Sequence, residues 1–220
     1  PYDPAALAGF FHDRRFDLCI ASYGRLRTIA AETVGKVGRL ISAGGVPAYR
    51  GYMNPALFEP AGLPVPTAED AVRVGLPEED EKGWRIVRTE QALFELHPEA
   101  THIRYPYVYG KYQPFPREWS ILRRLLDRRP FIILPDGGLT LMHMGYAENV
   151  AHGVLLAVDR PENARGRIYN CADEEVLSLR QMTEIAAATL GQAIEIVSMP
   201  WEIAPCTRPV SYTHIRAHAT

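Results

Sequence analysis

Two residues in the second half of this 220-residue sequence, His143 and Tyr146, carry groups that can exchange a proton with a bound substrate. A histidine titrates near neutral pH, and a tyrosine hydroxyl serves as a general acid or base once its surroundings adjust its pKa. The alternative is that both side chains make satisfied structural contacts. The residue types alone leave both interpretations open.

Three tyrosines, Tyr107, Tyr109 and Tyr112, cluster at the carboxyl end of a further predicted strand, Thr101 to Val108. Open α/β sheets bind ligands beyond the carboxyl ends of their strands, so these side chains are candidates for substrate contacts. A packed aromatic wall is an equally good interpretation of the same cluster.

The elements that must position these residues follow a strand–helix–strand order. Apolar runs at 16–22 and 38–43 predict two strands, and residues 25–34 between them predict a helix. Because the joints are short, this unit predicts a parallel sheet with helices on its faces. Further helices are predicted at 3–12, 84–96, 118–128, 146–158 and 178–190, and further strands at 131–134, 168–170 and 193–199. Residues 47–77 are rich in Pro and Gly and predict a long surface excursion.

The composition excludes some classes of protein. A formal net charge of −2 gives no bulk attraction to nucleic acid or anionic membrane, and the four arginines at 123, 124, 128 and 129 predict a solvated helix face. No stretch approaches the roughly 20 apolar residues of a membrane span. Cys19, Cys171 and Cys206 show no paired framework, which favours a reducing, cytoplasmic setting.

Both ends of the sequence look artificial. The chain begins at Pro1 without an initiator methionine, and residues 211–220 break the pattern of everything before them. We therefore expect a non-native tail at 211–220. In that case His214 and His218 are not a metal-binding or catalytic pair, and no metal site is expected.

Three ordered segments carry a resemblance to a known family. Residues 104–110 (RYPYVYG) resemble an R-P-x-x-V-Y-G strand end. Residues 135–138 (PDGG) with 148–151 (ENVA) resemble a G-D-G…D-D-x-A segment, and residues 166–171 (GRIYNC) with 177–180 (LSLR) resemble a G-x-x-Y/F-N-v…S/T-x-x-E segment. The chain is similar in these places to the extended short-chain dehydrogenases/reductases, the NAD-dependent epimerase/dehydratase-like family. The stretch from Arg117 to Pro130 is similar to an atypical branch that includes chloroplast stem-loop RNA-binding proteins.

The resemblance implies a Rossmann-like doubly wound parallel sheet whose N-terminal Gly-rich βαβ unit is missing, with a small C-terminal α/β substrate lobe. The expected boundaries are 1–112 for the remainder of the NAD(P)-binding domain and 113–205 for the lobe, some elements of which return to the core sheet. NAD or NADP is the implied cofactor. The implied cofactor contacts are Ser22, Tyr23, Ser42, Ala43, Gly44, Arg88, Tyr105, Pro106, Tyr107 and Val108. The implied substrate contacts are Tyr109, Tyr112, Trp119 and His143.

The family's Tyr-x-x-x-Lys pair is replaced in this chain. In that pair the lysine lowers the tyrosine pKa, and the tyrosine exchanges a proton with the substrate. The matching positions are Trp84 and Arg88, neither of which can act as a pKa-tuned Tyr–Lys pair. The companion serine falls on Gly44, and Met142 stands where the nucleotide-sugar branch has a diphosphate-binding arginine.

Two functional hypotheses follow. In the first, the intact parent is a cytoplasmic NAD(P)-binding epimerase, dehydratase or reductase that acts on a small polar, sugar-like substrate through His143 and Tyr146. In the second, it is a catalytically silent Rossmann scaffold that senses a dinucleotide or holds a protein or RNA partner. The chain as given is expected to be inactive. A homodimer through the helices at 25–34 and 84–96 is a further expectation, and nucleic acid is the less favoured partner.

Overall fold

The computed structural model describes residues 3–22, 24–113, 116–200 and 203, which form two compact units. Unit 1 comprises residues 1–106 and 148–172, and unit 2 comprises residues 107–147 and 173–220. Tyr23, Cys206 and the predicted tail at 211–220 lie outside the described residues.

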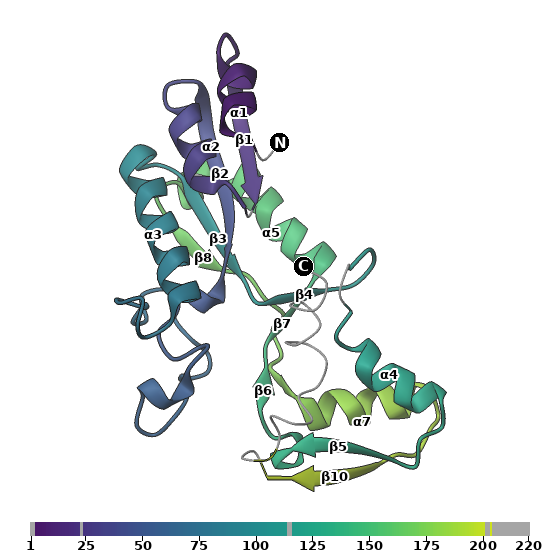
Figure 1. Cartoon of the computed structure of the whole chain (residues 1–220). Coiled ribbons are helices and arrows are strands. Elements are labelled where there is room, and N and C mark those ends of the chain that lie inside the picture. The colour runs from purple at the N-terminus through teal and green to yellow at the C-terminus, as the bar shows by residue number, and fades with distance from the viewer. Residues whose placement is uncertain (1–2, 23, 114–115, 201–202, 204–220) are drawn as a thin grey trace. The chain divides into compact units, whose positions relative to one another are not determined.

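Unit 1 is built on a parallel sheet of four strands in the order β1-β2-β3-β8 (Figure 1). The strands are β1 (Phe16–Ser22), β2 (Val37–Gly45), β3 (Thr101–Tyr105) and β8 (Ile168–Asn170). All three neighbouring pairs are parallel. The predicted α/β class with a Rossmann-like parallel sheet is therefore confirmed.

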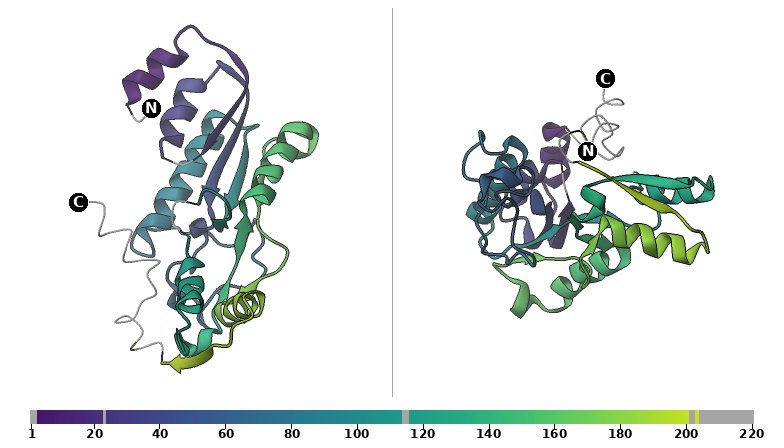
Figure 2. Two further views of the ribbon diagram at one scale, coloured as in Figure 1. Left: turned by 90° about the vertical axis from the view of Figure 1, so that its right-hand side faces the viewer. Right: turned by 90° about the horizontal axis from the view of Figure 1, so that it is seen from below.

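Helices cover both faces of this sheet (Figure 2). α2 (Leu26–Thr33) and α3 (Glu81–Leu96) pack on one face, where Leu26 and Leu93 meet Leu40 of β2. α5 (Ala147–Asp159) and α6 (Pro161–Ala164) pack on the other face, where Ala157 meets Ile103. α1 (Pro4–Phe11) lies beside α2. This two-faced core explains why successive residues of the inner strands are buried rather than alternately buried and exposed.

Local sequence signals set the helix ends. Asp3 and Asp80 cap α1 and α3, because the carboxylate of each accepts the main-chain N–H two residues ahead. Ser178 and Gln181 form a capping box at the start of α7 (Leu179–Thr189), the helix predicted at 178–190. Gly191, with a φ of +61°, follows the end of that helix.

The segment 101–108, predicted as one strand, is split at Pro106. Proline has no N–H to donate to a ladder. β3 ends at Tyr105 in the sheet of unit 1, and β4 (Tyr107–Tyr109) pairs in parallel with β7 (Met144–Tyr146) in unit 2. The single-strand prediction was wrong, and the break carries the chain from one unit to the other.

Unit 2 has its own small core. β5 (Phe131–Pro135) pairs in parallel with β10 (Glu195–Met199), and Ile132 and Leu134 of β5 pack against α4 (Trp119–Leu126) and α7. Two residues of β6 (Leu141–Met142) pair antiparallel with β9 (Leu177–Ser178). The turn after β5 is the short helix η3 (Asp136–Gly138).

The predicted excursion after β2 contains two short 3-10 turns, η1 (Val46–Ala48) and η2 (Pro55–Leu57). A bridge between Tyr49 and Arg73 closes its base. None of the helices in the described part of the chain is both long and apolar enough to cross a lipid bilayer.

Candidate functional site

Tyr109 and Tyr146 lie opposite each other in the β4–β7 ladder of unit 2. Their ring centroids are 5.6 Å apart with a tilt of 49° between the planes. Gly110 follows with a φ of +125°, and a side chain there would lie 2.9 Å from the Tyr146 ring. The absence of a side chain at Gly110 therefore lets the two tyrosines come together.

Asp173 holds this pair of strands from a third segment. Its Oδ1 accepts the main-chain N–H of Tyr146 at 2.9 Å, and its own N–H donates to the carbonyl of Met144 at 2.9 Å. Burial and a hydrogen bond to Asp173 raise the pKa of Tyr109, and the negative charge of Asp173 adds to the effect. Tyr109 therefore stays protonated, and its hydroxyl donates a hydrogen bond to the Asp173 carboxylate.

His143 joins the same cluster. Its Nε2 lies 2.6 Å from the main-chain carbonyl oxygen of Asp173. A carbonyl can only accept, so Nε2 carries the proton, and Nδ1 is the nitrogen that can take up another one. The charge of Glu118 also contributes to the raised pKa of Tyr109, and the Oε2 atom of Glu118 is buried with no hydrogen-bond partner among the described residues.

The structure thus brings together three of the residues singled out from the sequence: Tyr109, His143 and Tyr146. Sequence reasoning missed Asp173 and Glu118. Asp173 comes three residues after the predicted strand at 168–170, and a polar residue just beyond a parallel strand was a usable signal. Nothing in the local sequence marks Glu118.

The remaining aromatic candidates of unit 2 do not join this cluster. The Tyr112 side chain is 87% exposed, with a φ of +67° and the Lys111 ammonium over its ring. Arg117 lies over the Tyr107 ring. Trp119 begins α4 and is half exposed. The alternative of a packed wall of Tyr107, Tyr109 and Tyr112 is therefore wrong, because Tyr109 packs on Tyr146 instead.

In unit 1 the predicted cofactor contacts lie at the carboxyl ends of the strands. Ser22 ends β1 and is exposed. Ala43 and Gly44 lie near the end of β2, and Ser42 beside them is buried with its Oγ 2.7 Å from Nδ1 of His102. The Ser42 hydroxyl is thus engaged inside the sheet.

The other expected cofactor contacts, in and just after β3, are divided between the two units. Tyr105 packs half-buried against the core under α5. Pro106 ends the first of the two segments that make up unit 1, and Val108 pairs with Gly145 in unit 2.

A buried polar hub behind these strand ends was also missed by the sequence reasoning. Arg104 is 0% exposed and donates two hydrogen bonds to Glu90, at 2.8 and 2.7 Å, and a third to the Tyr49 hydroxyl at 2.8 Å. It also donates to the carbonyl of Glu69 at 3.1 Å. His102 completes the hub, with Nε2 3.3 Å from Glu90. The usable sequence signal was a charged residue, Arg104, inside a segment predicted as a strand.

Trp84 and Arg88, the positions that correspond to the Tyr–Lys pair, lie on α3. Trp84 packs half-buried against Ala48, Val74 and Val87. Arg88 is exposed and donates to Gln91 on its own helix at 3.0 Å. Within unit 1, Trp84 therefore packs in a core and Arg88 bonds along the helix surface.

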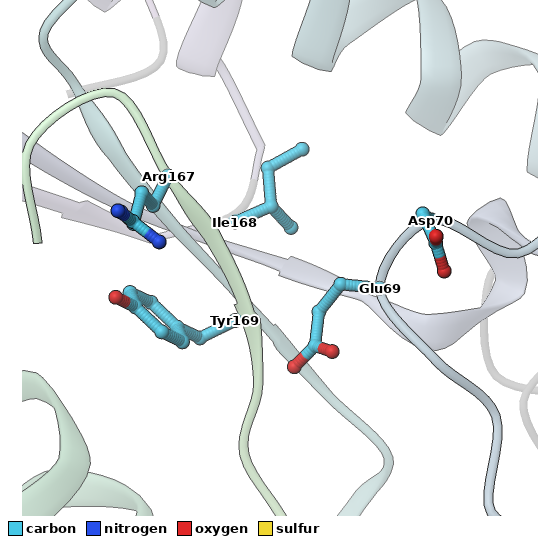
Figure 3. Close-up of a pocket in the computed structure, with 5 residues that line it drawn as sticks. All are labelled: Glu69, Asp70, Arg167, Ile168 and Tyr169. Atoms are coloured by element: carbon cyan, nitrogen blue, oxygen red, sulfur yellow. The ribbon is translucent and has the colours of Figure 1, made fainter.

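A shallow depression of about 390 Å³ lies beside the outer edge of β8 (Figure 3). Its lining residues are Glu69, Asp70, Arg167, Ile168 and Tyr169. The Glu69 carboxylate accepts the main-chain N–H of Asn170 at 2.9 Å, and the Asn170 amide donates to the carbonyl of Thr67 at 2.9 Å. These bonds fasten the excursion to the edge of the sheet, so Glu69 protects an otherwise open strand edge.

Comparison with known proteins gives the fold. No family model matches the chain. A curated relative, an uncharacterized protein of Sinorhizobium fredii, is 28% identical over 116 residues, which are 53% of this chain and 31% of the relative. The chain thus spans about a third of the length of that relative.

Among solved structures, UDP-glucose 4-epimerase from Thermotoga maritima aligns with a TM-score of 0.70 at 16% identity, over 90% of this chain and 69% of its own. UDP-glucuronic acid 4-epimerase from Bacillus cereus, in complex with NAD, aligns with a TM-score of 0.68 at 16% identity, over 90% of this chain and 67% of its own. Pal from Bacillus thuringiensis aligns with a TM-score of 0.66 at 15% identity, over 94% of this chain and 70% of its own. At these identities the likeness shows that the chain has the Rossmann-like fold of such epimerases.

Proposed function

We propose that this chain is part of a cytoplasmic NAD(P)-binding protein of the epimerase/dehydratase type that acts on a small polar, sugar-like substrate. In this proposal unit 1 holds the nicotinamide half of the dinucleotide, and unit 2 supplies the groups that contact the substrate. The solved neighbours include epimerases crystallised with NAD and with UDP-sugars, which supports both assignments.

The open edge of β1 is the observation that carries the proposal. In the sheet β1-β2-β3-β8 the strands follow one another in the same order as along the chain. None of the described strands pairs with the edge of β1 that faces away from β2. Phe16 and Ile20 of β1 are 37% and 53% exposed, although strands of a doubly wound sheet are normally covered on both faces. Dinucleotides bind where the strand order reverses, and in this sheet that point can only lie at the β1 edge.

We therefore infer that a Gly-rich βαβ segment pairs with β1 in the intact protein, as expected for an N-terminally truncated member of the family. Ser22, Ala43 and Gly44 lie at the carboxyl ends of β1 and β2. They would contact the ribose and nicotinamide, and the glycine turn of the added segment would hold the pyrophosphate at a helix N-terminus. The dinucleotide would supply the hydride chemistry. A homodimer through α2 and α3 remains part of this proposal.

A thermal-shift titration with NAD(H) and NADP(H) tests cofactor binding. The protein extended at its N-terminus by its own gene sequence should gain a few degrees in Tm with one of the cofactors, because a ligand that binds only the folded state stabilises it. The 220-residue chain is the matched control and should gain much less. No gain in the extended protein would overturn the proposal, and an equal gain in both would show that β1 needs no further strand for binding.

Paired substitutions test the role of unit 2. Tyr109→Phe and Tyr112→Phe remove the same hydroxyl from nearby positions, but only Tyr109 lies against Asp173 and Tyr146. In the extended protein Tyr109→Phe, His143→Ala and Tyr146→Phe should each lower turnover at least tenfold, and Tyr112→Phe should leave it unchanged. An equal loss of turnover in Tyr109→Phe and Tyr112→Phe would show that the cluster takes no part in the reaction.

A catalytically silent scaffold is the second candidate, and the placement of Trp84 and Arg88 favours it. A half-buried tryptophan packed in a core and a surface arginine on α3 do not form a Tyr–Lys pair. This candidate predicts cofactor binding without turnover of any sugar or sugar nucleotide. Turnover that is lost on His143→Ala or Tyr146→Phe would reject it.

A further inference from the structure

A second cavity in unit 1 lies on the face of the sheet that carries α5 and α6. Its volume is about 430 Å³, within the range of small-molecule sites. Ile103, Ala157 and Ala164 line it and are at most 7% exposed, so they form its base. Leu156 and Tyr169 also line it and are about 40% exposed, so they stand nearer its mouth. The cavity is therefore apolar inside and open to solvent at one end.

The walls of the cavity are fixed by contacts of the chain itself. Gly153 of α5 faces Cys171, and a side chain at Gly153 would lie 2.7 Å from the Cys171 sulfur. Arg39 donates hydrogen bonds to the carbonyls of Ala157 and Val158, which anchors the end of α5 against β2. The spacing between α5 and the sheet thus does not depend on a bound molecule, and the cavity is preformed.

One positively charged side chain lies at the edge of the cavity. Asn170 uses its side chain on Tyr49 and Thr67, and the Tyr169 hydroxyl donates to the carbonyl of Asn163. No carboxylate is among the lining residues. Arg160 lines the cavity, is exposed, and makes no side-chain hydrogen bond or ion pair within the described part of the chain. An apolar interior with a single unpaired guanidinium at its edge matches a hydrocarbon chain that ends in an acid.

We propose that this cavity binds a small amphipathic carboxylate, of the medium-chain fatty acid type. The hydrocarbon part lies on Ile103, Leu156 and Ala157, and the carboxylate pairs with Arg160. This site is separate from the dinucleotide and substrate positions proposed above, since all of its lining residues belong to α5, α6, β3 and the β8 region of unit 1.

Calorimetric or NMR titration of the 220-residue chain with octanoate tests the proposal without any cofactor. Binding should be saturable. Hexanoate should bind more weakly, by about fourfold for each methylene removed, because each buried methylene adds a constant increment of transfer free energy. Octylamine, which has the same chain and the opposite charge, should bind at least tenfold more weakly than octanoate. Equal binding of octanoate and octylamine would overturn the role of Arg160.

Two adjacent leucines of α5 provide a matched pair of variants. Leu155 and Leu156 are 55% and 45% exposed, but only Leu156 lines the cavity. Leu156→Asp places a negative charge beside the ligand and should abolish octanoate binding, whereas Leu155→Asp should leave it unchanged. Both changes fall on exposed positions, and circular dichroism confirms that each variant folds. Equal loss in both variants would show nonspecific adsorption to the helix surface and overturn the proposal.

The charge contact has its own control. Arg160→Gln should weaken octanoate about tenfold, the usual effect of losing a charged hydrogen-bond partner. Arg165→Gln removes an arginine that pairs with Glu99 outside the cavity and should have no effect. Because neither titration requires a dinucleotide, absence of octanoate binding would overturn this inference and leave the proposed function standing.

Discussion

Glu90 of α3 and Arg104 of β3 form a bidentate ion pair that is closed off from solvent, with N–O distances of 2.8 and 2.7 Å. Arg104 also reaches Tyr49 and the Glu69 carbonyl, so a single side chain ties α3, β3 and the excursion together. A buried pair of this kind is not in itself a large source of stability, but removal of one partner leaves an uncompensated charge.

Glu90→Gln should therefore lower the free energy of unfolding by about 3–5 kcal/mol, as expected when one partner of a buried ion pair is removed. Urea denaturation at pH 7 measures the effect. Glu81→Gln is the control, because Glu81 pairs with Arg85 on the exposed side of the same helix. A comparable loss in both variants would show that the buried pair has no special role.

The same pair should make stability depend on pH. Burial by itself raises the pKa of Glu90, but hydrogen bonds and charge from Arg104 and His102 outweigh it and bring the pKa to about 2. The ordinary carboxyl pKa is higher, so the unfolded chain binds this proton first as the pH falls. Stability should be at its full value above about pH 5 and decline by about 3 kcal/mol as the pH approaches 2. In Glu90→Gln this part of the decline should be absent.

Gly44 and His102 should be energetically coupled. A side chain at Gly44 would lie 2.5 Å from Nε2 of His102, so the imidazole fills the space in which a residue with a Cβ would stand. Gly44→Ala should destabilise the protein by about 1–3 kcal/mol through overpacking. In the background of His102→Ala the same change should cost much less, and a double-mutant cycle from thermal unfolding gives the coupling. Additive effects would contradict the contact.

Tyr109 should ionise at higher pH than an ordinary tyrosine. Burial disfavours the charged tyrosinate and raises the pKa most, and the hydrogen bond and charge of Asp173 raise it further. Absorbance at the tyrosinate band follows the titration, and the late step should vanish in Tyr109→Phe. Asp173→Asn removes the negative charge and should move the step back toward the ordinary value. The late step should persist in Tyr112→Phe, because that side chain is almost fully exposed and lies outside the Tyr109 cluster.

The capping box of α7 should contribute measurably to the stability of unit 2. Ser178→Ala leaves the N–H of Gln181 without its acceptor and should cost about 1 kcal/mol. Gln181→Glu keeps the reciprocal acceptor and adds negative charge at the helix N-terminus, so it should be neutral or stabilising. Chemical denaturation of both variants measures the difference, and an unchanged stability in Ser178→Ala would mean that the box contributes nothing.

The sequence by itself determined the order of elements, because hydrophobic period, caps and turn residues are local properties. The strands at 16–22 and 168–170 and the Ser178–Gln181 cap could all be predicted from neighbours in the chain. His143, Tyr146 and Tyr109 could be nominated by residue type.

Only the tertiary structure decided which side chains meet. Pro106 ends one sheet and lets the chain enter a second unit, in which Tyr109 lies on Tyr146 and both residues contact Asp173. Glu90 and Arg104 lie 14 residues apart in sequence and meet because a helix packs on a strand. Contacts of this kind depend on how distant segments pack, and no local pattern in a single sequence records them.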